Sequence, residues 1–371
     1  MNKIEDALFD GLTEKGKDTS TVILGKHKTF GLVQNCISTG SPSIDRIIAK
    51  DIEGKFGIPC GRISFISGKP SSGKTTLCLH LCAEAQRQGG IAYYIDSEHR
   101  VDRNYARIIG VDIEKLLYNA PSTLEDILEA TDKTIEVVGK LREDNKISEE
   151  ISKIPILIIV DSVSIATRAE KETGVTGGGK GEHARLLSRF LRKITPEISK
   201  LNIAILFVCQ IKSKINMGYN ARGSKETFLA EDTLRYHCTI GLRTQRISTL
   251  RNSKNIRYAD IDLYVTTKNS CLPPFQEAEV ELQYGIGFNY YASLTDTLIE
   301  YYGAESKGAW YNHKDIGKWQ GKDGIKKLIE KDPKIASEIS KILTSPAIVK
   351  IGVTKGSIKK ESISQNGEDD D

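Results

Sequence analysis

One nine-residue stretch constrains the fold of this chain more than any other segment. Residues 68–76 read G-K-P-S-S-G-K-T-T and fit the pattern G-x-x-x-x-G-K-[S/T]. The apolar residues 62–67 precede the stretch as a short buried strand would, and Leu77, Leu81 and Ala85 follow it at helical spacing. Strand, glycine-rich loop and helix form the context in which such a loop binds phosphate. The alternative is an ordinary glycine-rich turn that contains a lysine by chance.

The chemistry of the loop follows from its backbone. Gly68 and Gly73 let successive N–H groups face one anion, and the helix N-terminus adds partial positive charge at the same point. Lys74 reaches the β- and γ-phosphates, and the Thr75 hydroxyl holds Mg²⁺. The sequence therefore predicts a nucleoside triphosphate site. The expected phosphate-binding residues are Gly68, Lys69, Pro70, Ser71, Ser72, Gly73, Lys74, Thr75 and Thr76.

Composition is typical of a soluble globular protein. The 371 residues allow two or three domains, with 39% hydrophobic and 27% charged residues. No apolar run approaches the roughly 20 residues of a membrane helix, and the N-terminus lacks a signal-peptide apolar region. Seven scattered cysteines without a C-x-x-C pair favour a reducing, cytoplasmic location. Cys78 and Cys82 lie on one helix face, and His80 lies between them in the sequence. This pattern favours two buried thiols over a metal site.

Strands and helices alternate between residues 62 and 210. Continuous apolar strands that alternate with helices indicate a parallel sheet covered on both faces. Ligands of such sheets bind at the carboxyl ends of the strands, where Asp96, Asp161 and Gln210 stand. The expected strands are residues 62–67, 91–96, 155–161 and 203–210, and the expected helices are residues 123–138 and 183–201.

The pattern changes after the last of these strands. Residues 238–244, 260–267 and 278–284 predict shorter strands, and the alternation of polar and apolar residues within 262–266 predicts a half-exposed antiparallel extension. After about Asn289, helical patterns punctuated by glycine and lysine predict a small C-terminal domain. The polar segment that ends E-D-D-D predicts a disordered acidic tail. A helix is expected around residues 4–12.

The polar residues at the strand ends suit nucleotide chemistry. Asp161 can orient the Mg²⁺ shell, and the alternative is a helix cap. Glu98 can polarise the attacking water, and the alternative is a solvated loop residue. Gln210 can hydrogen-bond the γ-phosphate and move when it leaves, and the alternative is an ordinary polar strand end.

Two glycine-rich, basic loops flank this site, at about residues 170–182 and 211–228. The net charge of +4 argues weakly for a nucleic acid partner, but the distribution is more informative. Cationic segments with an aromatic side chain suit the phosphate backbone of single strands. The alternative is an ordinary solvated loop. The second loop carries Lys212, Lys214, Tyr219, Arg222 and Lys225.

In this order and spacing, the motifs resemble the bacterial RecA recombinase family along almost the whole chain. The phosphate loop and the segment I-D-S-E-H-R-V-D-R-N-Y at residues 95–105 closely resemble the corresponding family sequences. So do the helix A-R-L-L-S-R-F-L-R-K-I and the late G-A-W-Y. The other matching segments are S-T-G-S-x-x-x-D at 38–45, G-I-P-C-G at 57–61, T-K-N-S-C-L-P-P-F at 267–275 and L-Q-Y-G-I-G at 282–287.

The resemblance implies roles for individual residues. Glu98 would be the general base for ATP hydrolysis, with Lys74 and Gln210 beside it, and Gln210 would couple the γ-phosphate to the second DNA loop. Asp102 and Tyr105 would hold the adenine. The resemblance also implies that Lys268 reaches the nucleotide of a neighbouring protomer and that Tyr284 lies near the nucleotide. It implies DNA contacts by Arg185 and Ile215. Lys180 is expected to contact DNA phosphate because it is a cation of the first basic loop.

The resemblance also implies the architecture. We expect an α/β fold with a RecA-type P-loop NTPase core, in which the parallel sheet has an antiparallel extension. A small N-terminal helical element and a small C-terminal α+β domain would flank this core. The expected boundaries are 1–33 for the oligomerisation helix and connector, 34–288 for the core, 289–354 for the C-terminal domain and 355–371 for the tail.

The implied function is that of an ATP-dependent DNA recombinase. Such a protein forms a helical homo-oligomer on single-stranded DNA, searches homologous duplex DNA and exchanges strands. The rival interpretations are a hexameric helicase-type motor on the same core, and a DNA scaffold that uses ATP only as a clamp. Replicative helicases lack a domain with G-A-W-Y in this place.

Some residues depart from the family pattern. Ser270 stands where the family usually has a second lysine, and Lys180 replaces an apolar residue that wedges between bases. The second loop is longer than usual and contains K-E-T-F-L-A-E-D, and residues 140–153 form a charged excursion. These differences favour a phage- or plasmid-encoded relative.

Overall fold

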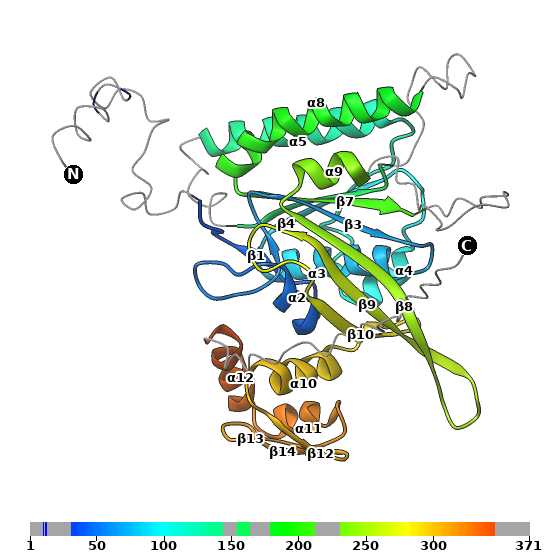
Figure 1. Ribbon diagram of the computed structural model, residues 1–371, viewed down its shortest axis with the longest axis vertical. Helices are drawn as coiled ribbons and strands as arrows, with labels where there is room; N and C mark the ends of the chain where they lie inside the picture. Colours follow the sequence, from blue (N-terminus) through cyan, green and yellow to red (C-terminus); the bar gives the residue numbers. More distant parts are fainter. Residues whose placement is uncertain are drawn as a thin grey trace, which may run out of the picture.

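The computed structural model describes residues 31–143, 154–163, 179–211 and 231–345, together with residues 10 and 12. A nine-stranded sheet runs through the core in the order β11-β10-β9-β8-β3-β7-β6-β4-β5 (Figure 1). Neighbouring strands from β8 to β5 pair in parallel. The parallel strands are β3 (Ile63–Gly68), β4 (Ile91–Asp96), β5 (Leu117–Asn119), β6 (Ile156–Asp161), β7 (Ile203–Gln210) and β8 (Ile240–Arg251).

Helices cover both faces of this sheet because its central strands are apolar on both faces. Leu157 and Ile159 of β6 pack on one side with helix α3 (Lys74–Arg87). Ile158 and Val160 pack on the other side, toward two long helices. Figure 1 shows these two layers. The first layer also contains α2 (Pro42–Ile48) and α4 (Arg103–Ile109), and the second contains α5 (Leu124–Glu143), α8 (Gly179–Lys200) and α9 (Glu231–His237).

The antiparallel extension is formed by β8, β9 (Arg257–Asn269), β10 (Glu277–Gln283) and β11 (Gly287–Phe288). The expected short strands are wrong for β8 and β9, which have 12 and 13 residues. Their hairpin projects from the core in Figure 1. The expected alternation is confirmed, but the polar side chains occupy the more deeply buried face, since Asp262, Tyr264 and Thr266 are at most 1% exposed.

The C-terminal unit is an α+β unit with a core of its own. Trp319 and Ile325 lie at the centre of this core, between the helices and a small antiparallel sheet. Side-chain and backbone hydrogen bonds from Ser43 to Ser293 join α2 to the first helix of the unit. The elements are α10 (Tyr290–Tyr301), β12 (Glu305–Lys307), β13 (Trp310–His313), β14 (Gly317–Gln320), α11 (Gly324–Lys331) and α12 (Lys334–Thr344).

The two long helices differ from their expected bounds. α5 runs five residues beyond the expected end at residue 138, and α8 begins at Gly179, inside the expected first loop. A small two-stranded sheet, β1 (Cys36–Ile37) with β2 (Ile58–Pro59), precedes the core strands. The first four residues of the expected excursion at 140–153 belong to α5, and its residues 144–153 lie outside the described residues. Most of the expected N-terminal helix and the acidic tail also lie outside them.

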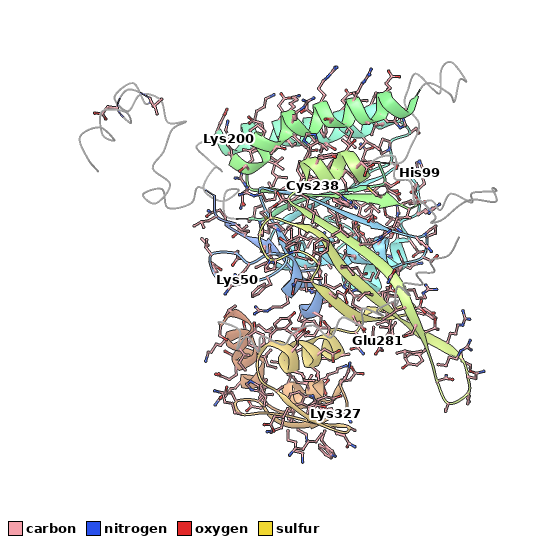
Figure 2. All side chains as sticks on the ribbon, viewed as in Figure 1. Lys50, His99, Lys200, Cys238, Glu281 and Lys327 are labelled. Atoms are coloured by element: carbon pink, nitrogen blue, oxygen red, sulfur yellow. The ribbon has the colours of Figure 1, made fainter. Side chains whose placement is uncertain are left out.

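Six of the seven cysteines are buried, and Cys271 is partly exposed. Cys78 and Cys82 are completely buried, as expected for core thiols, and no metal-binding group of His, Cys, Asp or Glu occurs among the described residues. Figure 2 labels Cys238, which is buried, and Lys200 and Lys327, which are exposed at α8 and α11. Within the described chain, no helix is both long and apolar enough to cross a membrane.

His80 joins the phosphate-loop helix to β11, the last strand before the C-terminal unit. Its Nε2 atom accepts the backbone N–H of Phe288 at 3.0 Å, and its ring stacks on that of Phe288 at 4.6 Å. Burial lowers the pKa of His80 to about 4, and nearby Arg87 acts in the same direction. The folded protein therefore holds a neutral imidazole at this junction.

The first prediction concerns acid stability. Because the folded pKa of His80 lies below the unfolded value of about 6.5, the unfolded chain binds more protons between these values, and the free energy of unfolding falls as pH falls. Between pH 7 and pH 4.5, we expect wild type to lose about 2–3 kcal/mol more than His80→Gln, which retains an acceptor but does not titrate. Denaturant titrations at constant ionic strength measure this difference, and parallel losses would contradict it.

Candidate functional site

The glycine-rich loop lies between β3, which ends at Gly68, and α3, which begins at Lys74. The Lys74 ammonium donates to the carbonyl oxygens of Gly68 and Lys69 at 2.9 and 2.7 Å. Lys74 is only 7% exposed, and burial lowers its pKa, which the negative charge of Asp161 opposes. The loop thus wraps around a buried cation.

Strand β8 braces the outer side of this loop. The Arg246 guanidinium donates to the Ser71 carbonyl at 2.7 Å, and the Thr244 hydroxyl donates to the Ser72 carbonyl at 2.9 Å. Ser71 has a positive φ of 58°, a conformation that is costly outside glycine. The brace therefore acts where the loop backbone is most strained.

The carboxyl ends of the neighbouring strands bring oxygen atoms to the loop. Asp161 Oδ2 accepts from the Thr75 hydroxyl at 3.0 Å and from the Tyr94 hydroxyl at 2.8 Å. Burial raises the pKa of Asp161, and both hydrogen bonds act against that rise. Hydroxyl and carboxylate oxygens are the ligands that Mg²⁺ prefers, so Thr75 and Asp161 fit the ion.

Glu98 lies in the same pocket and is held by several donors. Gln210 Nε2 lies 2.6 and 2.8 Å from its two oxygens, the Ser162 hydroxyl donates to Oε1 at 2.8 Å, and Arg100 lies 2.7 Å from Oε2. Gln210 ends β7, Ser162 directly follows β6, and Arg100 lies in the turn after β4. Figure 2 labels His99 of this turn at the edge of the molecule. Residues 70–76 line the pocket together with Glu98, Arg100, Asp161 and Gln210.

The two expected adenine-binding residues lie at the start of α4. The Asp102 side chain caps this helix and accepts the Tyr105 backbone N–H at 2.8 Å. The Tyr105 hydroxyl lies 3.1 Å from that of Thr76, the third residue of α3. Tyr105 is therefore anchored beside the phosphate-loop helix.

Lys268 lies away from this pocket within the protomer. It pairs with Gly241, which lies beside Phe65 of β3, whereas the phosphate loop begins at Gly68, beside Thr244. Its ammonium donates to the carbonyl oxygens of Arg235 and Tyr236, at 2.5 and 3.2 Å, at the end of α9. The described protomer does not bring Lys268 to its own phosphate loop.

Tyr284 is linked to the phosphate loop through two other side chains. Its hydroxyl donates to Asp260 Oδ1 at 2.7 Å, and Asp260 pairs with Arg246 at 2.7 Å. Arg246 in turn holds Ser71 in the loop.

The expected DNA-binding residues are described only in part. Arg185 is exposed on α8. The backbone of Lys180 is helical within α8, while its side chain is outside the description. Lys212, Lys214, Ile215, Tyr219, Arg222 and Lys225 lie outside the described residues.

Four residues of the site were missed from the sequence: Tyr94, Arg100, Ser162 and Arg246. Arg100 carried a usable signal, because it lies two positions from Glu98 in the same turn. Ser162 follows Asp161 directly and shares its strand end. No sequence signal indicated Tyr94 or Arg246, because their contacts depend on the packing of strands far apart in the sequence.

The fold and the site define the class of protein. A phosphate loop between β3 and α3, with a carboxylate at the end of the nearby strand β6, is the arrangement of a P-loop NTPase. The family model described as RecA N-terminal domain matches residues 3–289. The chain belongs to the RecA family.

Curated relatives extend the match beyond this domain. Protein RecA of Brucella anthropi is 34% identical over 369 residues, spanning 100% of this chain and 93% of the relative. Protein RecA of Brucella suis is 34% identical over 84% of this chain and 80% of its own length. Protein RecA of Rickettsia canadensis is 33% identical over 87% of each chain. Family membership supports a recombinase role in DNA recombination and repair and does not favour the motor or scaffold alternatives.

The second prediction tests the close packing of the loop. Gly73 and Gly89 flank α3 with φ values of 77° and 75°, so alanine should cost about 1 kcal/mol of backbone strain at either position. A Cβ atom at Gly73 would lie 2.8 Å from Asp262 Oδ2 and 2.9 Å from the Tyr264 hydroxyl, whereas Gly89 has nothing within 4 Å. We expect Gly73→Ala to weaken ATP binding at least about tenfold and Gly89→Ala to leave it unchanged. Titration with a fluorescent ATP analogue checks this, and equal affinities would contradict it.

Proposed function

We propose that the protein is an ATP-dependent recombinase that forms helical filaments on single-stranded DNA, pairs them with homologous duplex DNA and exchanges strands. DNA-dependent hydrolysis of ATP to ADP and phosphate would then weaken the filament. The observation that carries the proposal is the convergence of Lys74, Thr75, Asp161, Glu98 and Gln210 in one pocket of a RecA-family chain.

The pocket supplies the parts of phosphoryl transfer. The loop N–H groups and Lys74 bind and orient the phosphates. Thr75 and Asp161 hold Mg²⁺, which neutralises phosphate charge when bound. Glu98, which lines the same pocket as the loop, accepts a proton from the attacking water.

Gln210 links hydrolysis to DNA. Its amide contacts both Glu98 oxygens, so a γ-phosphate that attracts the amide would release the carboxylate. Gln210 is also the last residue of β7 and directly precedes the second basic loop. Its movement would therefore reach residues 211–228.

The remaining contacts complete the proposed nucleotide site. Asp102 and Tyr105 hold the adenine, with Tyr105 stacking on it. Tyr284 supports the loop through Asp260 and Arg246. Lys268 reaches the nucleotide of a neighbouring protomer, which is consistent with its position away from the loop of its own.

The third prediction tests the proposed function. Wild type should catalyse strand exchange between single-stranded and homologous duplex DNA with ATP. Lys74→Ala should lose this activity, because the β- and γ-phosphates lose their buried cation. Lys115→Ala on the exposed surface is the matched control and should remain active. Normal ATP-driven exchange by Lys74→Ala would contradict the proposed role of the loop.

The fourth prediction tests the DNA-binding loops. If Lys180, Lys212 and Lys214 contact phosphates, each alanine variant should weaken binding to all sequences and lower the salt slope by about one unit. Lys331→Ala, at the end of α11, is the control. Salt titrations of single-stranded DNA binding measure the slopes. Unchanged slopes would assign these lysines to solvated loops.

A further inference from the structure

Arg100 is a cation of the nucleotide pocket to which the proposal above gives no role. It lines the pocket with the phosphate loop, Glu98, Asp161 and Gln210. Its Nη1 atom lies 2.7 Å from Glu98 Oε2, and its side chain is 66% exposed. The guanidinium thus sits at the pocket mouth in contact with the proposed base.

The backbone of Arg100 is fixed although its side chain is exposed. Asp96, which is 1% exposed, accepts the N–H groups of Glu98, Arg100 and Val101 at 3.2, 2.8 and 3.0 Å. The Tyr118 hydroxyl adds a fourth hydrogen bond to this carboxylate at 3.0 Å. The turn therefore holds the Cα atom of Arg100 at the rim while the guanidinium is free to change partner.

Charge in the pocket favours such a change. Among the described residues that line it, Lys74 and Arg100 are the two cations, and Lys74 is tied to two loop carbonyls. A partly exposed ion pair such as Arg100–Glu98 contributes little to stability. An incoming γ-phosphate repels Glu98 and attracts the guanidinium, which matches phosphate oxygens with two parallel donors.

We propose that Arg100 is a catalytic residue that moves from Glu98 to the γ-phosphate and stabilises the transition state in its own protomer. The inference rests on the proposed ATPase function. Water oxygen attacks the γ-phosphorus, the bond from this atom to the bridging oxygen breaks, and its electron pair leaves with ADP. Glu98, freed of its ion pair, takes the water proton. Arg100 donates hydrogen bonds only and is regenerated when phosphate leaves.

The fifth prediction compares Arg100→Gln, Arg100→Lys and a control, Arg107→Gln, at an exposed position of α4 outside the pocket. In the presence of single-stranded DNA, Arg100→Gln should lower kcat for ATP hydrolysis by about 100-fold or more. Arg100→Lys should recover part of this loss, and Arg107→Gln should match wild type. Equilibrium titrations should show weaker binding of a non-hydrolysable ATP analogue to Arg100→Gln, with ADP affinity within about threefold of wild type.

The outcomes separate this inference from the proposed function. Wild type without DNA-stimulated hydrolysis would overturn both. Suppose that wild type hydrolyses ATP and Glu98→Gln hydrolyses it slowly. A kcat of Arg100→Gln within about threefold of wild type would then overturn only the catalytic role of Arg100. Increased kcat would overturn it too, since Arg100 would then only restrain the base. An equal loss of ADP and ATP-analogue affinity would assign Arg100 a structural role instead. If the glutamine variant does not fold, Arg100→Lys tests the proposal.

Discussion

Parallel strand pairing is the interaction on which the rest of this structure depends. The register sets Gly68 beside Gln210 and Asp96 beside Asp161, although members of each pair are far apart in the sequence. Because parallel strands end at the same edge, this pairing gathers the phosphate loop, the carboxylates and the amide into one pocket. The pairing is stabilised by apolar clusters on both faces of the sheet, in which the central strands are almost completely buried.

The antiparallel strands add a second level of support. Thr244 and Arg246 of β8 hold the loop carbonyls, while Asp260 of β9 orients Arg246. On the buried face of β9, Asp262 and Tyr264 fill the space that a side chain at Gly73 would need. The extension therefore shapes the nucleotide site and is more than an edge of the sheet.

The sequence predicted the features that depend on local pattern. Four apolar runs predicted β3, β4, β6 and β7 to within two residues, and strand ends predicted the positions of Asp161 and Gln210. Contacts that depend on register and packing were not predictable. The ion pair of Arg100 with Glu98 and the Tyr94 hydrogen bond to Asp161 are of this kind. The lengths of β8 and β9 were missed because their distal residues are exposed and carry no apolar run. All expected DNA contacts, including those of Lys180 and Arg185, remain predictions.

The central claim is that nucleotide at this pocket drives assembly on single-stranded DNA. Negative-stain electron microscopy of the full chain with ATP, Mg²⁺ and single-stranded DNA tests it most directly. The account predicts long, open helical filaments with ATP that shorten or vanish when ADP replaces it. Closed rings, or dispersed protomers under the same ATP conditions, would contradict the account.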